Sequence, residues 1–164
     1  MKIRIPLLAT IAAIAALAFS SCAQTPQQLT ADAVYASGYA AANDNLTHNP
    51  NLLPMIQDVA AKIPKVFTGG LSDNDLGVLN KEVGILAQNT TYLKAIVPAD
   101  SSKLDQALSF LAGLNQAINS TLAGKAPTMD QVAGQTVAIQ FANGLTGGIG
   151  YWQGANSVVA PAHP

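Results

Sequence analysis

The chain has 164 residues, of which 49% are hydrophobic and 10% are charged, and it carries a formal net charge of −1. Its single cysteine excludes a disulfide within the chain, so packing alone must hold its fold together. Beyond residue 21 it keeps six lysines, no arginine and nine acidic side chains, a net charge of −3, which excludes the arginine-rich basic surface of a nucleic-acid-binding protein.

Residues 1–21 have the composition of a secretory signal peptide. Lys2 and Arg4 form a short basic start, residues 5–19 are almost wholly apolar, and two serines precede Cys22. The apolar run of about fifteen residues is shorter than the ~20 needed to span a bilayer. The pattern therefore predicts a cleaved export signal and disfavours an uncleaved membrane anchor.

The segment Phe19-Ser20-Ser21-Cys22 resembles the lipobox of bacterial lipoproteins, although the family usually has Leu where this chain has Phe19. The resemblance implies that Cys22 is acylated, with palmitate among its fatty acids, and becomes the first residue of the mature protein. It also implies that Ala23, as the next residue, sorts the protein to the outer membrane, facing the periplasm. The alternative is ordinary cleavage after Ala23, which yields a soluble periplasmic or secreted protein.

After the signal, we expect a short tether at residues 22–28, one helical domain at residues 29–160 and a flexible tail at residues 161–164. Thr30 or a neighbour is suited to cap a first helix, whose inward-facing positions are Val34, Tyr35, Tyr39, Ala42 and Leu46. Residues 43–50 read as a turn-rich break. A short helix then covers about residues 52–62, with Ile56, Val59 and Ile63 buried, before Pro64 and the loop at Gly69 and Gly70.

The middle of the chain predicts an antiparallel helical hairpin. A row from Leu76 to Val97 repeats at alternating steps of three and four residues, with Ser72 and Asp73 available as caps and Pro98 as the stop. A wider apolar stripe follows from Leu104 to Leu122, and Gly124 ends it. With almost no strand signals elsewhere, the sequence predicts an all-α bundle of four to five helices.

A long Gly/Ala-rich helix completes the bundle, opened by the capping-box pattern Thr128-x-x-Gln131. Small residues recur in it every four positions and predict a close-packing ridge for a crossing helix or an oligomer contact. Because each glycine in a helix costs about 1 kcal/mol, the alternative is a chain that loosens after Asn143. The predicted ridge consists of Gly134, Ala138, Ala142, Thr146, Gly150 and Gly154.

No set of residues in the sequence predicts catalysis or a metal site. Asp44 and His48 have the i, i+4 spacing of metal ligands, but two ligands are too few for zinc and the turn-rich context favours a solvated loop. Glu82 follows Lys81 on an amphipathic helix, where a solvated face explains it. Asp73 and Asp75 match the start of a calcium loop, but without its glycine and terminal glutamate, helix capping is the better interpretation.

The segment that contains Gly147, Gly148 and Gly150 has no lysine of the kind that a phosphate-binding loop requires. We therefore predict no nucleotide or other cofactor. Tyr151 and Trp152 point about 100° apart on a helix, so one is expected to cap the core and the other to face outward. His163, the second-to-last residue of the chain, is not expected to act in catalysis.

Together these features predict a non-enzymatic envelope lipoprotein. A helical domain tethered to the membrane through acyl chains on Cys22 would act through contacts with a protein or with peptidoglycan, and its last helix offers a route to an oligomer. The alternative is a periplasmic carrier that holds an apolar ligand between its helices.

Overall fold

The computed structural model describes residues 31–125 and 131–157, with the side chains of residues 131–133 outside that description. In this part of the chain there are five α-helices, two short 3₁₀ turns and no strand, which confirms the predicted all-α bundle. The helices are α2 (Ala31–His48), α3 (Leu53–Val66), α4 (Asp73–Ile96), α5 (Ser101–Leu122) and α6 (Gln131–Ser157), and the 3₁₀ turns are η2 (Pro50–Leu52) and η3 (Pro98–Asp100).

Helices α4 and α5 form the predicted hairpin, and the residues predicted to cap or stop these helices lie at their ends. Ser72 caps α4: its hydroxyl accepts a hydrogen bond from the Asp75 backbone N–H at 3.2 Å, and the Asp75 carboxylate accepts one from the Ser72 N–H at 3.3 Å. Pro98 follows the end of α4, and Gly124 ends α5 with φ at +68°, a left-handed conformation that glycine adopts without strain. Between these ends, the predicted inward row of α4 is buried from Leu76 to Leu93, whereas Val97 lies beyond the helix and is only partly buried.

Helix α2 corrects the prediction of a turn-rich break at residues 43–50, because it remains helical to His48. Tertiary contacts explain the difference. Asn45 is 1% exposed, and its side-chain amide donates to the Ala41 carbonyl at 2.6 Å and to the Thr90 hydroxyl of α4 at 3.1 Å. These hydrogen bonds satisfy the buried amide of Asn45 and so stabilise the helical conformation at this position. The inward face predicted for α2 holds for its aliphatic positions, whereas Tyr35 is exposed.

Helix α3 also runs further than predicted, to Val66, with Pro64 inside its last turn. Its expected core positions, Ile56, Val59 and Ile63, are all buried. The loop prediction holds at Gly69, where φ is +68°. Pro64 therefore marks the last turn of the helix and does not end it.

Helix α6 continues through Gly154 to Ser157, so the chain does not loosen after Asn143. Its buried positions include Ala138, Phe141 and Leu145. It packs most extensively against α2 and also against α3. Packing on two sides offsets the poor helix propensity of its glycines.

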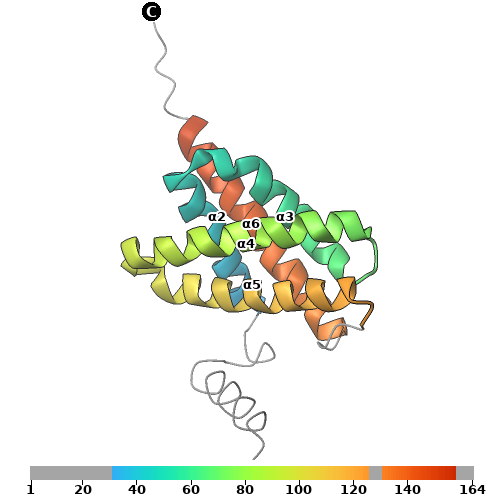
Figure 1. The fold of residues 1–164 in the computed structure, drawn as a ribbon. Coiled ribbons are helices and arrows are strands. Elements are labelled where there is room, and N and C mark those ends of the chain that lie inside the picture. The colour runs from blue at the N-terminus through green and yellow to red at the C-terminus, as the bar shows by residue number, and fades with distance from the viewer. Residues whose placement is uncertain (1–30, 126–130, 158–164) are drawn as a thin grey trace, which may run out of the picture.

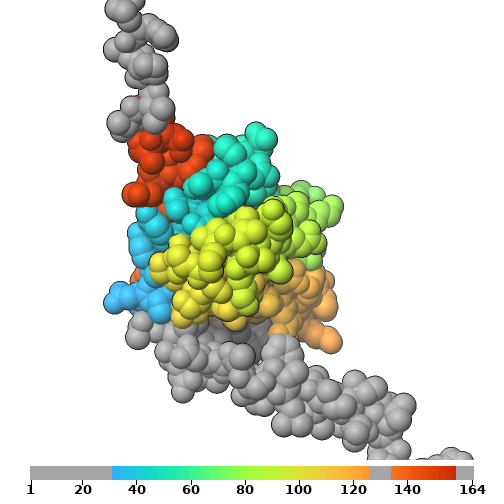
Figure 2. Space-filling model, turned by 90° about the vertical axis from the view of Figure 1, so that its left-hand side faces the viewer, coloured from blue at the N-terminus to red at the C-terminus, as the bar shows by residue number. Residues whose placement is uncertain are grey.

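The helices form two layers, as Figure 1 shows: α4 and α5 run side by side in front, and α6 crosses diagonally behind them with α2 and α3. One apolar core draws on all five helices. Figure 2 shows the side of the molecule where α2, the C-terminal end of α6 and the α4–α5 hairpin share one surface. Among residues 31–125 and 131–157, no helix combines the length and apolarity needed to cross a membrane.

Candidate functional site

Helices α2 and α6 cross with their backbones in close contact. Three buried glycines, Gly38 on α2 with Gly144 and Gly148 on α6, let the two backbones touch. A Cβ on Gly38 would overlap the Phe141 carbonyl oxygen, and one on Gly144 would overlap the carbonyl oxygen of Tyr35. A Cβ on Gly148 would lie 2.5 Å from the Tyr39 carbonyl oxygen. Close backbone approach of this kind requires small residues spaced four apart, as Gly144 and Gly148 are.

This crossing places three tyrosines together, and we call Tyr35, Tyr39 and Tyr151 the tyrosine cluster. The hydroxyl end of Tyr35 lies over Gly147, where a Cβ would overlap it. The rings of Tyr39 and Tyr151 lie 5.9 Å apart and are tilted by 53°, an arrangement that aromatic pairs favour. Tyr35 is 40% exposed and Tyr151 62% exposed, so the cluster presents aromatic surface to solvent on a fixed backbone.

Charged groups from α2 and the start of α5 border the cluster. Asp44 is buried; its Oδ1 accepts a hydrogen bond from the Asn43 amide at 3.2 Å, and its Oδ2 has no hydrogen-bond partner. Burial, and then repulsion from Asp100, raise the pKa of Asp44, whereas Asn43 lowers it less. Lys103 pairs with Asp100 at 2.5 Å. Burial also raises the pKa of Tyr39, and Tyr151 adds to this effect.

The structure does not make Asp44 and His48 a metal or acid–base pair. Both lie on α2 and not in the solvated loop that we expected, but His48 Nδ1 lies 2.9 Å from the backbone carbonyl oxygen of Asp44 and not from its carboxylate. Asp44 is buried while His48 is exposed. In the described part of the chain, no group of three His, Cys, Asp or Glu side chains could hold a metal ion.

The residues of the predicted close-packing ridge are buried in its first half and exposed in its second. Gly134, Ala138 and Ala142 are buried, but Thr146, Gly150 and Gly154 are exposed, and a Cβ on either of these two glycines would meet nothing within 4 Å. A row of residues four apart turns about 40° around the helix at each step, so it leaves the buried face within a few steps. The close contact with the backbone of α2 is made instead by Gly144 and Gly148.

Glu82 forms a second charged cluster, between α4 and α3. The solvated face expected for this part of α4 holds for Lys81, which is exposed, but Glu82 is half-buried and its Oε2 has no hydrogen-bond partner. Burial first, and the Asp58 carboxyl second, raise the pKa of Glu82 to about 7. Lys62, which pairs with Asp58 at 2.5 Å, opposes this rise. Burial of this carboxyl, with the Asp58 carboxyl beside it, therefore explains the raised pKa of Glu82.

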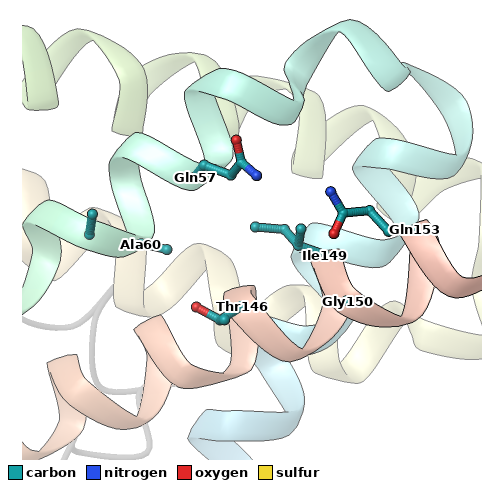
Figure 3. A pocket seen from close by; sticks show the side chains of 7 residues that line it. Gln57, Ala60, Thr146, Ile149, Gly150 and Gln153 are labelled. Carbon is teal, nitrogen blue, oxygen red and sulfur yellow. The ribbon is translucent and has the colours of Figure 1, made fainter.

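A shallow surface hollow of about 370 Å³ lies between α3 and α6 (Figure 3). The side chains of Gln57 and Gln153 flank it, and Ala60 and Ile149 supply its apolar lining. It lies at the surface and not between closely packed helices. Among the described residues, its mixed lining offers amide groups and the Thr146 hydroxyl but no titratable side chain.

Of the two adjacent aromatic residues on α6, Trp152 is the one that packs against the core, and Tyr151 is the exposed one. The glycines at 147, 148 and 150 lie within α6 and not in a phosphate-binding loop. Asp75 caps α4, as expected. Cys22, Thr30, Thr128 and His163, together with the predicted signal, tether and tail, lie outside the described residues.

Sequence reasoning missed the tyrosine cluster and the glycines that build it. The available signal was the pair Gly144-x-x-x-Gly148, which has the same four-residue spacing as the predicted ridge but lies on a neighbouring row of the helix. Comparison of the chain with family models, with curated proteins and with solved structures found no match. The site must therefore be interpreted from its own geometry.

Proposed function

We propose that this protein is a non-enzymatic lipoprotein of the bacterial envelope, anchored by acyl chains on Cys22 and acting through contacts with a protein or with peptidoglycan. The observation that carries this proposal is the pattern of residues 1–22: a basic start, an apolar run and two small residues before the single cysteine. The first described helix begins at Ala31, nine residues after Cys22. Even fully extended, nine residues reach only about 30 Å, so the body would stay close to the membrane surface.

The tyrosine cluster is the surface that we assign to those contacts. Its rings are held by a backbone crossing that cannot loosen without separating two helices, so little conformational entropy is lost when a partner binds. Tyrosine presents a broad apolar ring with one polar hydroxyl, which suits sugar faces and protein surfaces alike. Among the described residues around it, none is a nucleophile held by a base, which favours binding over catalysis.

The carrier alternative requires space between helices. At the α2–α6 crossing the backbones already touch, which leaves no room for a ligand there. The hollow at Gln57 and Gln153 is the feature that would favour a carrier, but its polar margins suit an apolar ligand poorly. Lipid that co-purifies with the protein, and is lost on substituting Ile149 with Gln, would support the carrier over the contact function.

The anchor is tested by Cys22→Ser in cells labelled with radioactive palmitate. We expect the label to disappear and the protein to leave the membrane fraction or to accumulate as precursor, because serine cannot accept the acyl chains in place of the thiol. Gln24→Ser, two residues further on, is the matched control and should keep both label and fractionation. A fully processed Cys22→Ser protein that remains in the membrane fraction would overturn the assignment.

The contact surface is tested in the same cells with Tyr151→Ser, because that side chain is 62% exposed and not needed for the core. Its yield in co-sedimentation with purified peptidoglycan, or in cross-linking to envelope proteins, should fall, while palmitate labelling stays normal. Ile139→Ser, on the same helix and 38% exposed, is the control and should behave as the parent. Equal yields for all three proteins would remove the tyrosine cluster from the proposal but leave the anchor intact.

A further inference from the structure

The hollow between α3 and α6 places two side-chain amides opposite each other. Gln57 reaches over it from α3 and Gln153 from α6, and Figure 3 shows the two amides turned toward each other with Ile149 between them. Both glutamines are exposed, and within residues 31–125 and 131–157 neither side chain makes a hydrogen bond. Each amide offers two N–H donors and one carbonyl acceptor, so all of these groups are available to a ligand.

Between the amides, the lining of the hollow is apolar and small. Ala60 and Ile149 form most of it, and Gly150 adds bare backbone, where a Cβ would meet nothing within 4 Å. The Thr146 hydroxyl donates to the Ala142 carbonyl at 3.0 Å, so toward the hollow it can only accept a hydrogen bond. The volume of about 370 Å³ falls within the range of about 300–1,000 Å³ that is usual for small-ligand sites.

This lining restricts the chemistry of a ligand. Among the described residues that line the hollow none is charged, so a charged ligand would lose hydration without gaining a partner. A wholly apolar ligand would cover the amides of Gln57 and Gln153 and leave them unpaired, which is costly. The ligand that fits is neutral, with an apolar face for Ile149 and polar groups on either side of that face.

We propose that this hollow binds a neutral saccharide that carries acetamido groups. A sugar ring has an apolar C–H face and a rim of hydroxyls, which match Ile149 and the two flanking amides. An acetamido group is itself an amide, so it can both donate to and accept from the side chain of Gln57 or Gln153. Its methyl group can then lie against Ala60, which is part of the same lining.

This saccharide site is separate from the tyrosine cluster. Gln153 follows Tyr151 by two positions on α6, which places the two side chains about 200° apart around the helix. The tyrosine faces α2, whereas the glutamine faces α3. The proposal therefore stands whether or not the tyrosine cluster binds a partner and whether or not Cys22 carries lipid.

A second hollow, of about 390 Å³ on α5, shows that amides alone do not make such a site. It is lined by Asn115, Gln116 and Asn119, among others. Asn119 donates to Asn115 at 2.7 Å and accepts from Asn80 of α4 at 3.2 Å, so these amides already bond one another. Lys125 also adds a charge to this lining. We therefore assign the saccharide to the hollow between α3 and α6 and take Gln116 as the control position.

The test is an NMR titration of the full-length protein, purified in a detergent without a sugar headgroup. The probe is the tetramer of N-acetylglucosamine, for which we expect saturable binding. The tetramer of glucose, which has the hydroxyls but no acetamido group, should bind at least about threefold more weakly, because it lacks the amide partner.

Variants of the lining locate the binding. Gln57→Ala and Gln153→Ala should each weaken it by about three- to tenfold, because each removes hydrogen bonds to the saccharide. Gly150→Leu should abolish it by filling the hollow, while the fold is kept, because a Cβ there meets nothing and leucine favours helix. Gln116→Ala, in the hollow on α5, should bind as the parent does. Circular dichroism of all four variants checks that they remain folded.

Three results would overturn the proposal. The first is a parent that shows no saturable binding of the N-acetylglucosamine tetramer, or that binds both tetramers equally. The second is a folded Gly150→Leu variant that binds as the parent does, or a Gln116→Ala variant that loses as much affinity as Gln153→Ala. The third is tighter binding of a neutral alanine tripeptide, acetylated and amidated at its ends, which would make the occupant a peptide and not a saccharide.

Discussion

Two of the packed helix pairs, α4 with α5 and α2 with α6, are held together in opposite ways. Helices α4 and α5 pack together and contribute large, fully buried aliphatic side chains such as Leu86 and Leu111 to the core. Helices α2 and α6 meet where side chains are missing, at Gly38, Gly144 and Gly148. An interface of leucines can adjust by small shifts of its side chains, whereas two backbones in contact have nothing that can move aside. The same small bundle therefore contains one tolerant and one intolerant interface.

The largest expected effect lies at the intolerant interface. Gly144→Ala places a methyl group on the Tyr35 carbonyl oxygen and 2.9 Å from the Tyr39 nitrogen, so the helices must separate. Overpacking costs about 1–3 kcal/mol and more where backbone blocks relaxation, so we expect a loss of at least about 3 kcal/mol or failure to fold. Gly150→Ala, six positions later in open space, is the control. Similar melting temperatures for the two variants would show that the close contact is not a constraint.

Charge distinguishes helix α6 from helix α4. Helix α6 contains no Asp, Glu, Lys or Arg, whereas α4 carries the half-buried Glu82. The pKa of Glu82 rises from 4.5 to about 7 on folding, so the folded state holds its proton more tightly than the unfolded state does. The stability that this provides is complete below pH 4.5 and is lost as the pH rises to about 7.

Glu82→Gln should therefore stabilise the protein at pH 8 relative to the parent and have little effect near pH 4.5. Because solvent screens a half-exposed carboxyl, we expect a difference of about 1–2 kcal/mol between the two pH values. Urea unfolding of the parent and the variant at both pH values measures it. Lys81→Gln, the exposed neighbour, should show no such pH dependence. A parent–variant difference that is independent of pH would contradict the proton linkage.

The smallest expected effect is a gain in stability, from a substitution in α4, a helix of the tolerant pair. A Cβ on Gly84 of α4 would meet nothing within 4 Å, so Gly84→Ala only restricts the unfolded chain and favours helix. It should raise the free energy of unfolding by about 0.5–1 kcal/mol. Thermal melting of this variant beside Gly144→Ala would show the same substitution acting in opposite directions on the two pairs.

Most of the fold could be predicted from the sequence because its signals are local. The hairpin ends at Ser72, Pro98 and Gly124 follow from backbone chemistry that needs no neighbour. The prediction of a break at residues 43–50 was wrong because the helix there depends on a contact with a distant part of the chain. Asn45 looked like a turn residue, but its amide pairs with Thr90, 45 positions away, and this partner cannot be read from local spacing.

The candidate site was harder to predict for a related reason. A four-residue spacing identifies rows of small residues but not which row faces a neighbour, and α6 has several such rows. Only the position of α2 selects Gly144 and Gly148 over Gly150 and Gly154. The tyrosine cluster follows from the same contact, since Tyr39 and Tyr151 come from helices at opposite ends of the described chain.

That contact also decides when the chain can finish folding. Gly38 is synthesised about a hundred residues before Gly144. The face of α2 around Gly38 therefore has no helix to pack against until α6 has been made. The α4–α5 hairpin, by contrast, pairs neighbours and can form early. A chain cut short before α6 would leave the first helix without its principal contact. Completion of the fold thus requires that α6 has been synthesised, and chains terminated before it would stay open to proteases.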